Sequence, residues 1–267
     1  MQKALKYVTF LDLIFIMFIA ASGMTGGIVG EVIYYLGFLV PVLLAFVIKS
    51  YNGVEFSAPK LKISRENLAL TVPIVAPIIA LVFLASWLTT LLLSALGASN
   101  EIELSGNIVL IILTHAVLTA VCEEALFRYI PIALISPYSK KYAVIFSALF
   151  FAFAHCDLYQ IPYALLAGII FAVIDIATDS IIPSLLIHFV NNLISIIWIR
   201  GEGKTFTVTY LVILSVTAAV SLIFVFALRK RYLKKLSSAF CDRGKVALSY
   251  EPILFFATTL FVACLSL

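Results

Sequence analysis

The sequence predicts an all-α protein, a polytopic membrane helical bundle of about eight transmembrane helices with a short ninth apolar segment at the C-terminus. Three observations lead to this fold class. Of the 267 residues, 63% are hydrophobic and only 12% are charged. The mean hydropathy of +1.15 is far above that of an ordinary soluble domain. The apolar residues are also gathered into long runs separated by short polar connections.

A helix needs about 20 apolar residues to cross a bilayer. By this rule the predicted helices are 7–22, 32–48, 68–96, 108–130, 142–156, 161–177, 181–199 and 206–228, with the ninth segment at 252–267. Lys3 and Lys6 precede the first run, but further runs follow it, so we interpret it as an uncleaved helix and not as a signal peptide. No internal repeat is visible, and one integral membrane domain, 1–267, is the simplest description.

Lysine and arginine residues occupy alternate connections. One set holds Lys3 and Lys6, then the basic residues of 49–65, then Lys140 and Lys141, and finally a 229–245 loop with seven basic residues. The other connections are nearly bare, apart from Arg200 and Lys204. Because basic connections face the cytoplasm, we expect a cell-membrane protein with a cytoplasmic N-terminus. The net charge of +4 then reports topology and predicts no nucleic-acid partner, although the 229–245 loop suits contact with membrane lipid.

The cysteines predict neither a disulfide framework nor lipid attachment. They are Cys122, Cys156, Cys241 and Cys264, and they form no CxxC pair. The last four residues match a prenylation box only formally, because Cys264 lies within an apolar run and Ser266 stands where an aliphatic residue is preferred. We therefore expect no prenylation of this chain.

Several polar side chains interrupt the apolar runs. They are Asp12, His115, Glu123, Glu124, Arg128, His155, Asp175, His188, Asn191 and Asn192. An ionised group at the centre of a bilayer costs roughly 2.5–3.5 kcal/mol, so each such group is a functional-site hypothesis. Asp12, Asp175 and the loop-edge Glu31 have no partner at an informative spacing. We interpret these three as helix-end or packing groups.

The strongest cluster is the adjacent pair Glu123 and Glu124 with Arg128. Glu124 and Arg128 are four residues apart, so they share a helix face and can form an ion pair. Glu123 is turned about 100° around the helix and is predicted to point away from that pair. The alternative is that both carboxylates neutralise Arg128 in a polar core, which leaves a surplus of negative charge.

The chain's three histidines all lie in apolar runs. His188 and Asn192 are four residues apart and should project to one side of their helix. His155 ends a run of alternating small and aromatic residues, 151–155, which suits a closely packed helix. His115 precedes Glu123 by two helical turns and is interpreted as a supporting or packing residue.

These residue types suit amide hydrolysis. A carboxylate helped by an imidazole can act as general base toward a water molecule, while His and Asn donors can stabilise an oxyanion. The alternative is a zinc site with Glu123, His155 and His188 as ligands. No HExxH helix supports it. Catalysis by Cys122 or Cys156 is disfavoured, because each lies one helical step away from the key residues.

Three motifs in order resemble a known family. Glu123-Glu124-x-x-x-Arg128, Phe151-x-x-x-His155 and His188-x-x-x-Asn192 are similar to the signature of the CPBP intramembrane proteases. That family includes the CAAX prenyl endopeptidases and the Abi or bacteriocin-processing proteins. The resemblance covers 108–199, which is the predicted catalytic core.

The resemblance implies an all-helical endopeptidase with a polar cavity that opens toward the cytoplasmic side. Carried over by motif, Glu123 and His155 activate water, His188 and Asn192 form the oxyanion hole, and Glu124 and Arg128 support the site. We favour the glutamate-dependent mechanism without a cofactor over the zinc version. The implied substrate is a peptide or protein, with prenylated C-termini as one candidate class, and the oligomeric state is left open.

Helix depth is the one observation that does not fit. At ~1.5 Å per residue, Glu123 and His188 come out about 10 Å from the cytoplasmic edge, but His155 comes out at about 20 Å. Two rival functions remain. A proton-coupled transporter would use Glu123, Glu124 and Arg128 as a relay, but it predicts repeated halves that are not visible. An immunity or scaffolding protein would keep the fold without activity.

Overall fold

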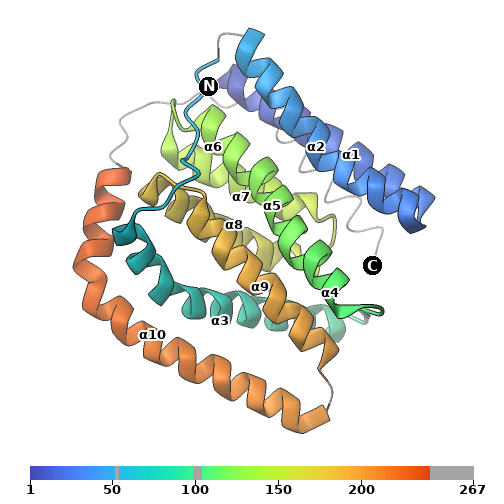
Figure 1. The fold of residues 1–267 in the computed structure, drawn as a ribbon, viewed down its shortest axis with the longest axis vertical. Helices are drawn as coiled ribbons and strands as arrows, with labels where there is room; N and C mark the ends of the chain where they lie inside the picture. Colours follow the sequence, from blue (N-terminus) through green and yellow to red (C-terminus); the bar gives the residue numbers. More distant parts are fainter. Residues whose placement is uncertain (52–53, 99–103, 202, 241–267) are drawn as a thin grey trace.

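The computed structural model describes residues 1–51, 54–98, 104–201 and 203–240 (Figure 1). Its helices are α1 (Gln2–Thr25), α2 (Gly27–Tyr51), α3 (Arg65–Ala95), α4 (Ile108–Ile111), η1 (Ile112–Leu118), α5 (Thr119–Glu124), η2 (Ala125–Tyr129), α6 (Ile130–Ile135), α7 (Lys140–Ala154), α8 (Ile161–Thr178), α9 (Ile182–Arg200) and α10 (Gly203–Ala239). The described ranges contain no strand beyond an isolated bridge between Lys60 and Ser180. The predicted all-α class is therefore confirmed.

The helices from α4 to α6 join without a break, so the described residues form eight continuous helices. Seven of the eight are long and apolar enough to cross a membrane. The exception is α7, which corresponds to the predicted helix 142–156. With 15 residues it reaches only ~22 Å, less than the ~30 Å of a bilayer core. The predicted segment 252–267 lies outside the described residues.

Local sequence signals explain where three of these helices begin. Ser64, Asn107 and Ser139 precede α3, α4 and α7, and each side chain accepts a hydrogen bond from a backbone N–H of the first turn. This is the usual way to satisfy the free donors at a helix start. Proline occupies the first turn of both α8 and α9, where no N–H partner is needed.

The C-terminal basic segment differs from the prediction. A loop was expected over 229–245, but α10 continues as a helix to Ala239. Leucine, lysine and arginine favour helix formation, and the first glycine after Arg229 is Gly244, so nothing interrupts the helix at the membrane boundary. The charged residues between Arg229 and Lys235 therefore lie on the last turns of a long helix.

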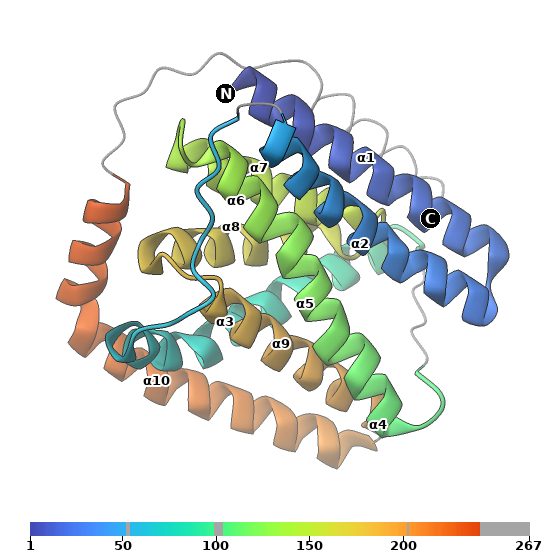
Figure 2. The same ribbon diagram turned by 45° about the horizontal axis from the view of Figure 1, so that its top comes forward.

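Three helix pairs flank the centre of the bundle. α1 packs on α2, α7 on α8, and α10 on α3, while α5 contacts α9. Figures 1 and 2 show α5 and α9 in the middle, with α1 and α2 along one side and α3 and α10 along the other. The contact between α7 and α8 is very close, because a Cβ atom on Gly168 would lie 2.9 Å from the Cα of Ala148. A larger residue at position 168 would therefore push the two helices apart.

One end of the bundle collects the basic connections, and we call it the basic end. Lys60 donates its backbone N–H to Asp179 at 3.1 Å, and its side chain pairs with Asp179 at 2.7 Å. The side-chain hydrogen bond to Asp179 and the charge of that carboxylate raise the pKa of Lys60. The backbone of Ser57 donates to Ala133 near the end of α6, and Tyr232 of α10 donates to Leu70 of α3.

The opposite end, here called the far end, holds the connections that were predicted to be nearly free of charge. Arg200, the last residue of α9, donates to the carbonyl of Gly106 before α4 at 2.6 Å. In Figure 1 the far end lies at the lower right, where α4 and α10 begin and α9 ends. The alternation of basic and bare connections along the sequence thus corresponds to two ends of one bundle.

Candidate active site

The two glutamates lie between π-helical segments, which the sequence analysis did not predict. η1 precedes and η2 follows the short helix α5 that contains Glu123 and Glu124. Carbonyl groups in these wider turns have side-chain partners. The carbonyl of Thr114 accepts from Tyr35 at 3.3 Å, and that of Phe127 accepts from the Ser147 hydroxyl at 2.6 Å. Such π-helical turns are often found at functional sites.

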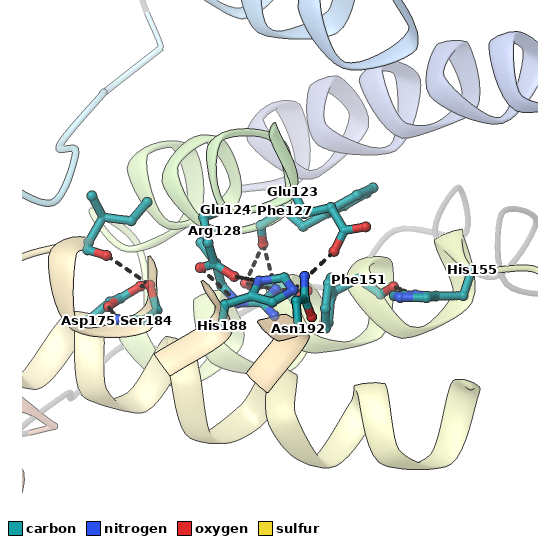
Figure 3. A network of polar contacts seen from close by, with 12 residues as sticks. Glu123, Glu124, Phe127, Arg128, Phe151, His155, Asp175, Ser184, His188 and Asn192 are labelled. Atoms are coloured by element: carbon teal, nitrogen blue, oxygen red, sulfur yellow. Dashed lines mark hydrogen bonds and ion pairs between the residues drawn. The ribbon is translucent and has the colours of Figure 1, made fainter. Parts of the chain in front are cut away.

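His188 lies between the two carboxylates (Figure 3). Its Nδ1 is 2.8 Å from Glu124 Oε1, and its Nε2 is 3.4 Å from Glu123 Oε2. The predicted pair also forms, since Arg128 Nε is 3.8 Å from Glu124 Oε2. However, Glu123 was expected to point away from that pair, whereas both glutamates converge on one imidazole ring. The ring makes this arrangement possible because its two nitrogens face in different directions.

The two ring nitrogens of His188 have different partners. Nδ1 lies at hydrogen-bond distance from Glu124, and Nε2 faces Glu123 at the longer distance. Each nitrogen donates when it carries a proton. The ring is therefore held between two carboxylates.

Arg128 is completely buried, with 0% of its surface exposed. Its Nη1 donates to the carbonyl of Phe127 at 3.1 Å and to that of Ser147 at 3.3 Å. The guanidinium carbon lies 4.1 Å from the centre of the Phe151 ring and 5.8 Å from that of Phe171. Arg128 thus compensates the charge of Glu124 and also packs on two aromatic faces.

Asp175 belongs to this buried region and has a partner that the sequence analysis did not predict. Its carboxylate accepts from the Ser184 hydroxyl at 2.7 Å and from the Ser184 backbone N–H at 3.3 Å. The two residues lie on α8 and α9, on either side of a tight turn. Asp175 lies in the last turn of α8 and is buried, as its interpretation as a helix-end or packing group predicts, but its partner was not predicted. A nine-residue spacing across a turn has no helical signature, so only the fold reveals the pair.

Asp12 is not a helix-end group, because it lies in the middle of α1 and is 1% exposed. Neither of its carboxylate oxygens has a hydrogen-bond partner among the described residues. Glu31 is exposed near the start of α2, as its interpretation as a loop-edge group predicts. Cys122 and Cys156 are free thiols.

His155 is separated from the glutamates by Phe151. The rings of His155 and His188 lie against the same Phe151 ring, with centroid distances of 4.9 Å and 5.7 Å (Figure 3). His155 Nδ1 is 2.8 Å from the carbonyl of Phe151, so it carries the proton and leaves the Nε2 lone pair for another partner. No hydrogen bond or ion pair joins His155 to Glu123 in the described part of the chain. His155 therefore lies next to the carboxylate and imidazole cluster without bonding to Glu123.

Asn192 projects from α9 one turn after His188, as its spacing predicts. Its Nδ2 donates to the carbonyl of His115 at 3.3 Å, which uses one of the two amide protons. His115 bonds its ring Nδ1 to the hydroxyl of Thr114 at 2.8 Å. The hydrogen bond from Asn192 to the His115 carbonyl does not use the second amide proton of Asn192.

All these motif regions meet at one cavity of about 870 Å³. Its wall includes Glu123, His155, His188, Asn191, Asn192 and His115, together with many aromatic side chains. The residues beneath Glu123 and His188, which are Glu124, Arg128, Asp175 and Ser184, are buried and do not line it. The cavity therefore has a polar floor with a buried ionic network behind it.

The cavity lies between the buried ionic network of Glu124, Arg128 and Asp175 and the far end of the bundle. The resemblance implied an opening toward the cytoplasmic side, and the basic connections predict that the cytoplasm is at the basic end. These two expectations disagree, because the lining extends from Glu123 and His188 to residues of α3, α8, α9 and α10 that lie next to the far end.

The predicted zinc ligands are Glu123, His155 and His188. Glu123 and His188 are close enough to share an ion, but Phe151 separates His155 from both of them. Across the described ranges, no three His, Cys, Asp or Glu side chains are arranged to hold a metal ion. The set of Glu123, His155 and His188 does not fit a three-ligand zinc site in this arrangement.

The fold and site together define an integral membrane protein with a carboxylate and imidazole site inside its bundle. Residues 105–194 match the family model described as type II CAAX prenyl endopeptidase Rce1-like. The match covers about a third of the chain, nearly coincides with the predicted core 108–199, and confirms the resemblance to the CPBP family. Comparison with curated proteins and with solved structures gave no match. Residues 105–194 are thus similar to the core of the CAAX-type membrane proteases, a class that acts on peptides or proteins.

Proposed function

We propose that the chain is a glutamate-type intramembrane endopeptidase, and that Glu123 is its general base. The convergence of Glu123 and Glu124 on His188, at the floor of the cavity, carries this proposal. The two carboxylates beside the imidazole of His188 take different roles. Glu124, held by Arg128, orients His188, and Glu123 faces the cavity where a water and a peptide can enter.

The reaction follows from these positions. Glu123 takes a proton from water as the water oxygen attacks the carbonyl carbon of the peptide bond. Negative charge that develops on the carbonyl oxygen is stabilised by the Nε2–H of His188 and by the second amide proton of Asn192. Protonated Glu123 then gives its proton to the leaving nitrogen. The products are a carboxylic acid and an amine.

His155 takes a different part from the one its motif implied. Since Phe151 separates it from Glu123, it is better placed to contact the bound peptide than the attacking water. The match to a protease family also favours hydrolysis over proton-coupled transport. Prenylated C-termini remain one candidate class of substrate.

The function is tested by assaying the purified protein against a panel of quenched membrane peptides, prenylated and unprenylated. We expect the parent to cleave at least one peptide, and His188→Ala to cleave it about 100- to 1,000-fold more slowly, because the oxyanion loses a hydrogen-bond donor. Leu186→Ala, on the exposed face of the same helix, is the matched control. A His188→Ala protein that is folded and as fast as the parent would show the assignment to be wrong.

Removal of metal separates the two mechanisms. Because Glu123, His155 and His188 do not converge on one point, we expect full activity after exhaustive dialysis against a chelator. The measurement is the initial rate of cleavage, with metal content determined by mass spectrometry. Loss of activity that Zn²⁺ restores would contradict the glutamate-type mechanism.

A further inference from the structure

The cavity extends from Glu123 and His188, in the interior of the bundle, to the far end. α3 runs from the basic end and lines the cavity only from Ile79 to Thr90. α8 starts at the far end and lines it only as far as Phe171, although the helix continues to Thr178. α10 contributes only its first turns, up to Tyr210. No residue of the connections at the basic end belongs to the described lining.

Exposure increases along the cavity in the same direction. At its floor, Glu123 and His188 are 8% and 4% exposed. Trp87, near the end of α3, is 55% exposed and lines the same cavity. Behind the floor, on the side of the basic end, Arg128 and Asp175 are fully buried. The ionic network therefore closes the cavity toward the basic end, and the mouth is at the far end.

Aromatic side chains mark this mouth as a membrane interface. The chain has two tryptophans, Trp87 and Trp198, and both line the cavity. Trp198 packs against Phe83 and Tyr210, with ring centroids 5.1 Å and 4.8 Å away. Tryptophan and tyrosine are enriched where the hydrocarbon core meets the headgroups. The mouth thus lies at the depth of the headgroups on the side away from the basic connections.

The charges of the connections identify that side. Lysine and arginine concentrate at the basic end, and the positive-inside rule assigns that end to the cytoplasm. We propose that the active site receives its substrate from the non-cytoplasmic side of the membrane. This inference rests on the proposed function and names its substrate class: apolar peptide segments of membrane-anchored or translocated polypeptides. It replaces the expectation of cleavage near the cytoplasmic face.

The lining also restricts the charge of the substrate. Glu123 is the only Asp or Glu in the described lining, which contains no Lys or Arg. A free carboxylate that entered the cavity would meet no fixed arginine or lysine and would lie near the Glu123 charge. Aromatic and aliphatic side chains form most of the wall. A neutral, apolar segment with the scissile bond inside it therefore fits better than a charged chain end.

Sealed vesicles of known orientation test the position of the mouth. The probe is a quenched apolar peptide coupled to dextran, which does not cross the membrane. In vesicles with the basic end outward, verified by cleavage of an N-terminal tag, we expect cleavage to rise about tenfold or more when the vesicles are opened, since the hydrocarbon core excludes the probe. Vesicles of the opposite orientation should cleave it equally well when sealed. Equal rates before and after opening of the basic-end-outward vesicles would overturn the proposal.

Labelling of intact cells tests the absolute side without any assay of cleavage. In a chain whose four cysteines are replaced by serine, Leu96→Cys places a thiol at the far end and Lys141→Cys places a matched thiol at the basic end. We expect an impermeant maleimide to label only the Leu96→Cys protein. Labelling of Lys141→Cys alone would overturn the proposal. Failure of the detergent-solubilised protein to cleave any peptide would instead count against the proposed function, and the labelling result would stand apart from it.

Discussion

Replacing Glu123 with glutamine is expected to slow peptide cleavage by about 100- to 10,000-fold, the range for loss of a general base. Glutamine keeps the size of the side chain and its contact with His188 but cannot accept a proton from water. The protein should fold normally, because among the described residues Arg128 forms its ion pair with Glu124 and not with Glu123. The measurement is the initial rate on the best peptide of the panel, together with the unfolding temperature in detergent.

Glu66→Gln is the matched control for this variant. Glu66 lies exposed in the first turn of α3, at the basic end and outside the cavity. Its replacement removes the same charge from the chain and should leave cleavage unchanged. If Glu123→Gln and Glu66→Gln both retain the parent rate, Glu123 is not the base.

Replacing Arg128 with methionine is expected to lower the free energy of unfolding by about 3–5 kcal/mol, the cost of leaving a buried charge without its partner. Methionine fills much of the space between Phe151 and Phe171, so the loss would report charge more than packing. The measurement is chemical unfolding in mixed micelles. The same variant should lose cleavage, because Glu124 would no longer hold His188 in place.

A double-mutant cycle isolates the charge effect. Glu124→Gln combined with Arg128→Met removes both members of the ion pair, so part of the lost stability should return. A double variant as unstable as the sum of its single variants would show that the two side chains do not interact. The single variant Glu124→Gln is the control for the hydrogen bond to His188.

Much of this fold follows from apolar runs. Seven of the eight predicted spans are helices that can cross a membrane, since about 20 apolar residues in a row have few alternatives in lipid. The extension of α10 to Ala239 was not predicted, because the end of an apolar run marks the membrane boundary and not the end of the helix. The ion pair of Glu124 and Arg128 was predictable from its four-residue spacing.

The convergence of helices was harder to predict. Nothing in the local sequence indicates that Glu123 and Glu124 meet the same imidazole, because that depends on how α9 packs on α5 and on the wider turns around Glu123. The position of the cavity is likewise a property of several helices together. Residue counts along the helices already set His155 apart in depth, but only the structure shows that Phe151 lies between His155 and His188.

The π-helical segments on either side of α5 affect the direction in which Glu123 points. In an α-helix each residue adds about 100° of rotation, so one residue more or less before Glu123 would turn its side chain from the cavity toward a neighbouring helix or lipid. η1 and η2 set this rotation while α4, α5 and α6 remain one continuous helix. The number of residues between Asn107 and Glu123 therefore decides whether the Glu123 side chain faces the cavity.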